Sequence, residues 1–273
     1  MDGPFLSLEN LAAEVPDGAM LAVPPDYSGV AMAATRALIR RGVKNLHLLA
    51  VPTSGIQAEL LIGIGAVSTL EAAAVTMGEL GPAPRFTALV KSGAFVLKDS
   101  TCPAIHAALQ AAEKGLPFMP LRGLIGSDIL AFRPDWRIAE NPFGDNDPVV
   151  LLPALQPDIA LFHAPLADRA GNVWIGRRRE LMVMAHAARR TLVTVEEIYD
   201  GDLLADERMV SGTIPSLYIG AVAEAQRGAW PIGLEGRYEA DGEHLALYAR
   251  AARTEDGFRR YLAEHVLVER RAA

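Results

Sequence analysis

The sequence predicts an α/β fold: a single domain over residues 1–273, with a mainly parallel sheet flanked by helices. Short aliphatic runs alternate with helical patterns, an order typical of parallel strands joined by helices. The 273 residues are 51% hydrophobic, enough for one large core, and no repeat or low-complexity stretch divides them. Aromatic residues make up only 6%, so we expect burial on more than one side, by parallel strands or by a partner chain.

The first quarter of the chain contains two strand–loop–helix units. Gly42 follows a helical pattern as a typical C′ residue, and Gly55 precedes a second, shorter helix. In order, we expect a strand over 20–23, a loop over 24–29, a helix over 30–41, a strand over 45–51, a loop over 52–55 and a helix over 56–61.

The second half continues the alternation with longer helices. Two prolines make 116–121 an irregular or edge strand, and Thr254 is a natural N-cap for the last helix. Residues 133–148, rich in Pro, Gly, Asn and Asp, are expected to form a long surface loop. The remaining predictions are strands over 149–152, 159–163, 173–175 and 191–195, and helices over 102–114, 180–190, 244–253 and 255–265.

The composition argues against several classes of partner. The formal net charge is −7 and no run of five or six basic residues occurs, so nucleic acid is not expected. The densest basic spot, 177–179, is expected to be a solvated helix start. Cys102 is the single cysteine, which rules out an internal disulfide and a cysteine-rich zinc site and points to a reducing compartment.

The hydropathy pattern gives no sign of a membrane protein. No stretch of about 18 apolar residues runs without a charge, Gly or Pro. Residues 1–11 lack the basic start and apolar run of a secretory signal. We therefore expect a cytoplasmic protein with neither a membrane nor a nucleic acid as its partner.

Short catalytic and metal-binding motifs are weak. Residues 63–68 approach a dinucleotide fingerprint, but Ser68 replaces the third glycine and the segment follows a helix, so a helix-to-strand turn is predicted. None of the six histidines forms H-x-H or H-E-x-x-H, and no metal site is expected. His47 lies inside an apolar strand as a core residue. His163 ends a strand and opens a loop, where α/β sheets place ligands.

Two adjacent carboxylates, Glu196 and Glu197, lie on a predicted strand. Successive side chains of a strand point to opposite faces, so the two cannot form an acid/base pair. One of them can line a cleft while the other is solvated or ion-paired.

Three loops with Gly, Ser or both, 24–29, 53–55 and 123–128, each follow a strand-like run. In a parallel sheet such loops share one edge, where their N–H groups can bind a carbonyl or carboxylate oxygen. Together they predict a crevice for a small molecule.

A further set of stretches runs in a specific order from about residue 8 to 268: LPFMP (116–120), GLIGSD (123–128), NPF (141–143), PDIALFHA (157–164), DRAGNV (168–173), VTVEEI (193–198), 221–230 and TEDGF (254–258). In order and spacing they resemble the α subunit of family I coenzyme A transferases, particularly glutaconate CoA-transferase. The resemblance implies a fold of the ribose-5-phosphate isomerase and CoA-transferase type.

The resemblance also implies an activity and a partner. It implies the α subunit of a hetero-oligomeric CoA-transferase, α2β2 or larger, that moves CoA between carboxylic acids. In that family the β subunit supplies a Glu that attacks the acyl-CoA and becomes a glutamyl-CoA thioester. No catalytic residue is therefore expected in this chain, and Glu235 is interpreted as structural. The CoA thioester is a substrate, and no permanently bound cofactor is expected.

The resemblance places substrate contacts of this chain in its loops. Arg122 is expected to pair with a substrate carboxylate, as a bidentate guanidinium does. The predicted substrate-binding residues are Ser54, Gly55, Arg122, Gly126, Ser127 and His163.

The first loop departs from the family pattern. A Gly-Gly-Phe-like turn that helps form an oxyanion pocket is replaced by Pro24-Pro25-Asp26, and proline has no N–H to donate. Two alternatives stay open: the α subunit of a hydrolase of the same fold that opens a ring in acyl-CoA esters, and a non-catalytic module that senses a small ligand. The lack of an appended helix-turn-helix counts against the sensor.

Overall fold

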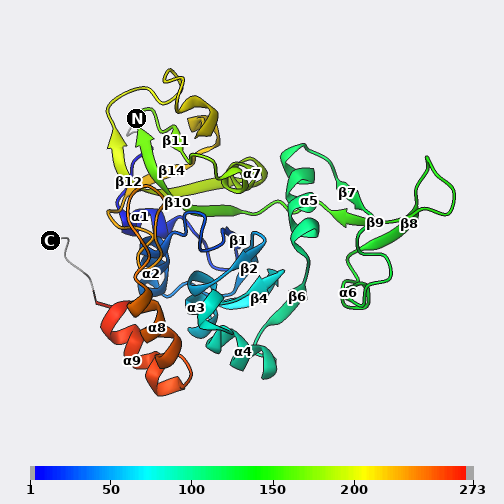
Figure 1. The fold of residues 1–273 in the computed structure, drawn as a ribbon, viewed down its shortest axis with the longest axis horizontal. Helices are drawn as coiled ribbons and strands as arrows, with labels where there is room; N and C mark the ends of the chain where they lie inside the picture. Colours follow the sequence, from blue (N-terminus) through cyan, green and yellow to red (C-terminus); the bar gives the residue numbers. More distant parts are fainter. Residues whose placement is uncertain (1–3, 269–273) are drawn as a thin grey trace.

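A mainly parallel sheet forms the centre of the protein, which a computed structural model describes over residues 4–268 (Figure 1). Within that range the sheet has nine strands. Parallel pairs give the order β6-β4-β2-β1-β10-β12-β14, and the antiparallel β11 and β13 lie beside the end of β10. The strands are β1 Met20–Val23, β2 Leu46–Ala50, β4 Val67–Ala72, β6 Val96–Asp99, β10 Ile159–Asp168, β11 Val173–Trp174, β12 Arg190–Tyr199, β13 Thr213–Ile214 and β14 Ala221–Glu224.

The predicted α/β class and parallel sheet are confirmed. The αL Gly42 ends α2, and Thr254 caps α9 by accepting a hydrogen bond from the Gly257 N–H. Four strands of the sheet, β4, β6, β13 and β14, were not predicted, and the helices α1, α4 and α6 were not predicted either. The helices are α1 Leu8–Ala13, α2 Met32–Arg41, α3 Ile56–Gly63, α4 Pro84–Lys91, α5 Cys102–Glu113, α6 Ile129–Phe132, α7 Arg179–Ala187, α8 Gly242–Ala251 and α9 Glu255–His265.

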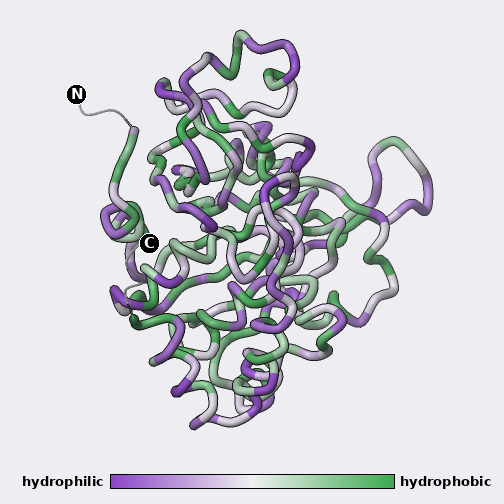
Figure 2. Tube along the Cα trace, turned by 60° about the vertical axis from the view of Figure 1, so that its left-hand side comes forward, coloured by the Kyte–Doolittle hydropathy of each residue, from purple (hydrophilic) through white to green (hydrophobic). Residues whose placement is uncertain are grey.

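Both faces of the sheet are buried, because alternate residues of each central strand enter different cores. In β1, Leu21 and Val23 pack with α1–α4, α8 and α9, whereas Ala22 packs with α5 and α7. Leu161 and Phe162 of β10 divide in the same way. Figure 2 shows the result as hydrophobic segments inside the molecule and hydrophilic ones mostly at its outer turns.

The segment 116–153, called the arm here, projects from the body beyond α5 (Figure 1). It contains α6 and a three-stranded antiparallel sheet in the order β7-β9-β8: Phe118–Leu121, Pro148–Pro153 and Arg137–Glu140. The predicted strand 149–152 exists but belongs to this sheet, not to the parallel one. The prediction of a surface loop over 133–148 is wrong in part, since β8 pairs with β9 along its length.

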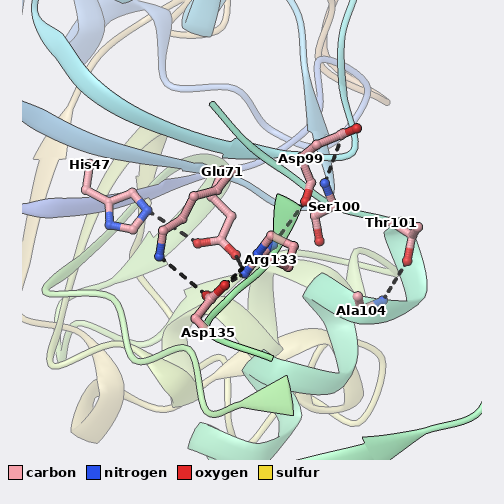
Figure 3. A network of polar contacts seen from close by, with 9 residues as sticks. His47, Glu71, Asp99, Ser100, Thr101, Ala104, Arg133 and Asp135 are labelled. Carbon is pink, nitrogen blue, oxygen red and sulfur yellow. Dashed lines mark hydrogen bonds and ion pairs between the residues drawn. The ribbon is translucent and has the colours of Figure 1, made fainter. Parts of the chain in front are cut away.

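A buried ionic network joins the arm to the parallel sheet. Arg133 of the arm donates to Glu71 Oε1 of β4 at 2.7 Å and to the Asp99 carbonyl at 3.1 Å (Figure 3). Asp135 binds the same guanidinium, which lies 4.0 Å over the Trp136 ring. The arm is therefore held by charge as well as by its apolar contact with α5.

Among residues 4–268, no helix has both the length and the apolarity to cross a bilayer.

Candidate functional site

A cavity of about 340 Å³ opens where β10 runs past the end of β1. Of the ten residues of β10, only those at its start pair with β1. The loop after β1 therefore lies beside the later residues of β10. The cavity is lined mainly by apolar groups, among them Tyr27, Trp174, Ile175, Leu181 and Leu234. It lies at the carboxyl edge of the parallel strands, the usual position of ligands in such sheets.

His163 reaches this cavity from inside β10. The strand continues to Asp168, so the expected end of the strand at His163 and the loop after it are wrong. The His163 backbone N–H donates to the Gly29 carbonyl at 2.7 Å, which ties β10 to the loop after β1. Its imidazole is fully buried, with Nδ1 2.9 Å from Thr194 Oγ1 and Nε2 2.7 Å from Glu196 Oε1.

Glu196 is the anionic centre of this network. Besides His163, the Tyr238 hydroxyl donates to it at 2.7 Å, and the Arg227 and Gly228 N–H groups donate at 2.7 and 3.0 Å. Burial alone would raise the pKa of Glu196, but these hydrogen bonds and the charge of His163 lower it to about 2. The carboxylate is therefore a fixed acceptor that orients His163.

Glu197 points elsewhere and forms an ion pair with Arg237 at 2.9 Å. The two adjacent carboxylates thus have separate partners, as the alternation of strand side chains predicts. The sequence did not predict the role of Tyr238, because its position depends on a turn that only the tertiary fold brings back to β12.

Replacing Glu196 with Gln is expected to destabilise the protein by about 2 kcal/mol at neutral pH. The depressed carboxyl pKa contributes stability above about pH 4.5, and that stability is lost as the pH falls towards 2. Urea unfolding at pH 7 and pH 3 should therefore show a smaller loss on acidification for Glu196→Gln than for wild type. Glu197→Gln is the matched control, and equal behaviour of the two variants would contradict the role given to Glu196.

Ser54 ends the two-residue strand β3 (Thr53–Ser54), which pairs with β5 (Ala74–Val75), so the predicted loop 52–55 is a strand in part, and Gly55 after it lies against Asp26. Ser54 is only 2% exposed, and its hydroxyl has no hydrogen-bond partner within the described chain. A Cβ at Gly55 would lie 2.0 Å from Asp26 Oδ2, so the loops 24–29 and 53–55 do share one edge, as predicted. Burial raises the pKa of Asp26 to about 6, although the Gly55 and Ile56 N–H groups donate to it.

The other three predicted substrate residues lie in the arm. Arg122 is largely exposed and holds Asp147 through a bidentate ion pair, and Gly126 and Ser127 follow β7 in the antiparallel sheet. The expectation that loop 123–128 shares the edge with the other two loops is wrong, because β7 is not a strand of the parallel sheet. A contact of these three residues with substrate stays a prediction.

Charged side chains stand at the mouth of the cavity. Glu235 pairs with both Arg177 and Arg178, with 3.0 Å between Arg178 Nη2 and Glu235 Oε2. Arg178 also lies over the Tyr27 ring at 5.7 Å. The helix α7 begins at Arg179, as expected for 177–179, but Arg177, although largely exposed, and Arg178 both line the cavity.

In the part of the chain that the structure describes, no three His, Cys, Asp or Glu side chains are grouped as a metal site would require.

The fold and the cavity at its carboxyl edge define an α/β protein with a site for a small molecule, and the comparison with known families identifies its class. The model of the coenzyme A transferase family matches residues 5–225, so the chain belongs to that family. It is 31% identical to the α subunit of 3-oxoadipate CoA-transferase from Pseudomonas knackmussii, over 92% of this chain and 89% of that one. The crystal structure of glutaconate CoA-transferase from Acidaminococcus fermentans superposes with a TM-score of 0.88 at 26% identity, covering 97% of this chain and 89% of that chain.

Other relatives carry different names and lengths. The chain spans about half (53%) of a protein from Archaeoglobus fulgidus to which it is 34% identical over 87% of its own length. A cholesterol ring-cleaving hydrolase subunit of Rhodococcus jostii is 26% identical, with 86% and 82% coverage. A variant of the decarboxylase AibA/AibB superposes with a TM-score of 0.81 at 29% identity, with 95% and 98% coverage.

Proposed function

We propose that this chain is the α subunit of a two-subunit CoA-transferase that moves CoA between carboxylic acids in the cytoplasm. The observation that carries the proposal is the near full-length match to the α subunit of 3-oxoadipate CoA-transferase. The partner is a β subunit of similar fold, in an α2β2 or larger complex. The cavity at the carboxyl edge of the sheet supplies part of the acyl site.

The proposal assigns the nucleophile to the partner. Its Glu carboxylate attacks the thioester carbonyl and releases CoA thiolate, giving a mixed anhydride. The thiolate then attacks the glutamyl carbonyl, releases the first acid and leaves a glutamyl-CoA thioester, which the second acid's carboxylate resolves by the reverse steps. Glu235, which lines the cavity, and Glu196, which contacts His163, support that assignment, since Glu196 is held by four donors and Glu235 by two arginines.

The test is co-expression with a candidate β chain, followed by incubation with acyl-CoA labelled in its CoA moiety. We expect label bound to the partner chain as a hydroxylamine-sensitive thioester, and its transfer to an added acid. Cys102→Ser is the control, because the exposed Cys102 could otherwise take up CoA as a mixed disulfide. Absence of label from the partner chain would contradict the proposal.

The ring-opening hydrolase is the second candidate, favoured by the relative of that name and by the loss of N–H donors at Pro24 and Pro25. The same incubation distinguishes it. Carbon–carbon cleavage of a cyclic acyl-CoA without exchange of CoA would identify the hydrolase instead.

A further inference from the structure

Asp26 brings a carboxylate from the loop after β1 to the first turn of α3. Its Oδ2 lies 3.3 Å from the Ile56 N–H, and the Gly55 N–H also donates to the carboxylate. Gly55 is the N-cap of α3 and has no side chain to serve as a cap. Glu59 in the first turn of α3 does not take that role, because its carboxylate accepts from the N–H groups of Arg85 and Phe86 in α4.

Two buried oxygens at this place have no hydrogen-bond partner within residues 4–268: Asp26 Oδ1 and Ser54 Oγ. A buried carboxylate oxygen normally has a donor, and leaving it without one is costly. The unpartnered carboxylate oxygen and the hydroxyl oxygen both have lone pairs that lack a donor, and a second carboxylate would bring no donor to them.

A helix N-terminus with free N–H groups attracts an anion, and the Asp26 carboxylate shows that a carboxylate fits at this one. We propose that Asp26 is a specificity-determining residue: its carboxylate fills an anion-binding position at the N-terminus of α3 and thereby excludes acids that would place a second carboxylate there. The inference rests on the proposed function for the identity of the ligand as an acid substrate. The existence of the anion-binding position at the N-terminus of α3 does not depend on that function.

The surroundings of Asp26 support this exclusion. The next residue, Tyr27, lines the cavity, so the filled position adjoins the proposed acyl site. Burial raises the Asp26 pKa to about 6, and an anionic neighbour would raise it further. A second carboxylate beside Asp26 is therefore unfavourable above pH 6, whereas an uncharged acyl end meets no such repulsion.

The first experiment uses the full-length chain and acetate as the probe. Asp26→Ser opens the position, and Asp26→Asn removes the charge but leaves the position filled. We expect acetate to shift the Gly55 and Ile56 amide resonances saturably in Asp26→Ser, and not in wild type or Asp26→Asn. Asp145→Gly, a change at an exposed residue of the arm, is the control. If Asp26→Ser does not fold, Asp26→Gly replaces it. Identical responses of the open and filled variants would overturn the proposal.

The second experiment uses the complex of this chain with its β partner and two acids of equal chain length, pentanoate and pentanedioate. We expect wild type to favour pentanoate, and Asp26→Ser to shift the ratio of kcat/KM values towards pentanedioate by about 10-fold or more, the effect of one hydrogen bond to a charged group. An unchanged ratio in an active complex would refute the specificity role. A wild-type complex that transfers CoA to no acid would refute the proposed function instead, and the acetate titration would still decide whether the position exists.

Discussion

Replacing Gly29 with alanine is expected to lower the free energy of unfolding by about 3 kcal/mol or more and to abolish activity of the complex. Gly29 has a φ of +71°, and a Cβ there would lie 2.2 Å from the His163 carbonyl oxygen. The clash is with backbone of a buried strand, which cannot move aside. The His163 N–H to Gly29 carbonyl bond of 2.7 Å would break with it.

Gly18→Ala separates this clash from simple backbone strain. Gly18 has a φ of +81° but nothing within 4 Å of its would-be Cβ, so only the strain of about 1 kcal/mol should remain. Urea unfolding of both variants measures the difference. Equal destabilisation by Gly29→Ala and Gly18→Ala would mean that the close approach of β10 to the loop after β1 is not what requires glycine at position 29.

Arg133→Leu is expected to destabilise the protein by about 3–5 kcal/mol, because it leaves the buried Glu71 carboxylate without its cation. The two side chains are 2% and 1% exposed. Burial alone would raise the Glu71 pKa, but the His47 imidazole, with Nε2 3.4 Å from Glu71 Oε2, and the charge of Arg133 lower it. In wild type this pair stabilises the fold above about pH 4.5, and that contribution falls as the pH drops further.

In Arg133→Leu the pH dependence of stability is expected to have the opposite sign. Without Arg133 burial dominates, the Glu71 pKa rises, and stability should then decrease as the pH rises through the new value. The double variant Arg133→Leu with Glu71→Leu should recover much of the loss, since no charge is left buried. Urea unfolding across pH measures these effects. Arg122→Leu, which breaks an exposed pair in the same arm, should change little. If it matched Arg133→Leu, burial would not be the cause.

The alternating pattern predicted the central strands well because those strands are buried on both faces and are nearly pure aliphatic runs. β6 and the arm were harder to predict. Val96 and Leu97 of β6 lie exposed at the edge of the sheet, where the run is short and ends in Lys98 and Asp99. Pairing of β8 with β9 depends on contacts between strands, which local composition does not encode.

The site was predictable only in part. Strand order placed the loops 24–29 and 53–55 at one edge, since the parallel β1 and β2 are neighbours. It did not place 123–128, whose preceding strand belongs to another sheet. Tyr238 and Arg178 were not predicted because each reaches the site from a segment distant in sequence from its contact.

By itself the sequence determined the α/β class, the buried central strands, the order of the stretches that resemble the family, and the departure at Pro24-Pro25-Asp26. These depend on the chain's own periodicity and residue types. The tertiary structure alone decided that Asp26 meets the first turn of α3, that Glu196 holds His163, and that the arm forms a separate sheet. Each of those depends on groups far apart in sequence, and the packing of both sheet faces brings them within hydrogen-bond distance.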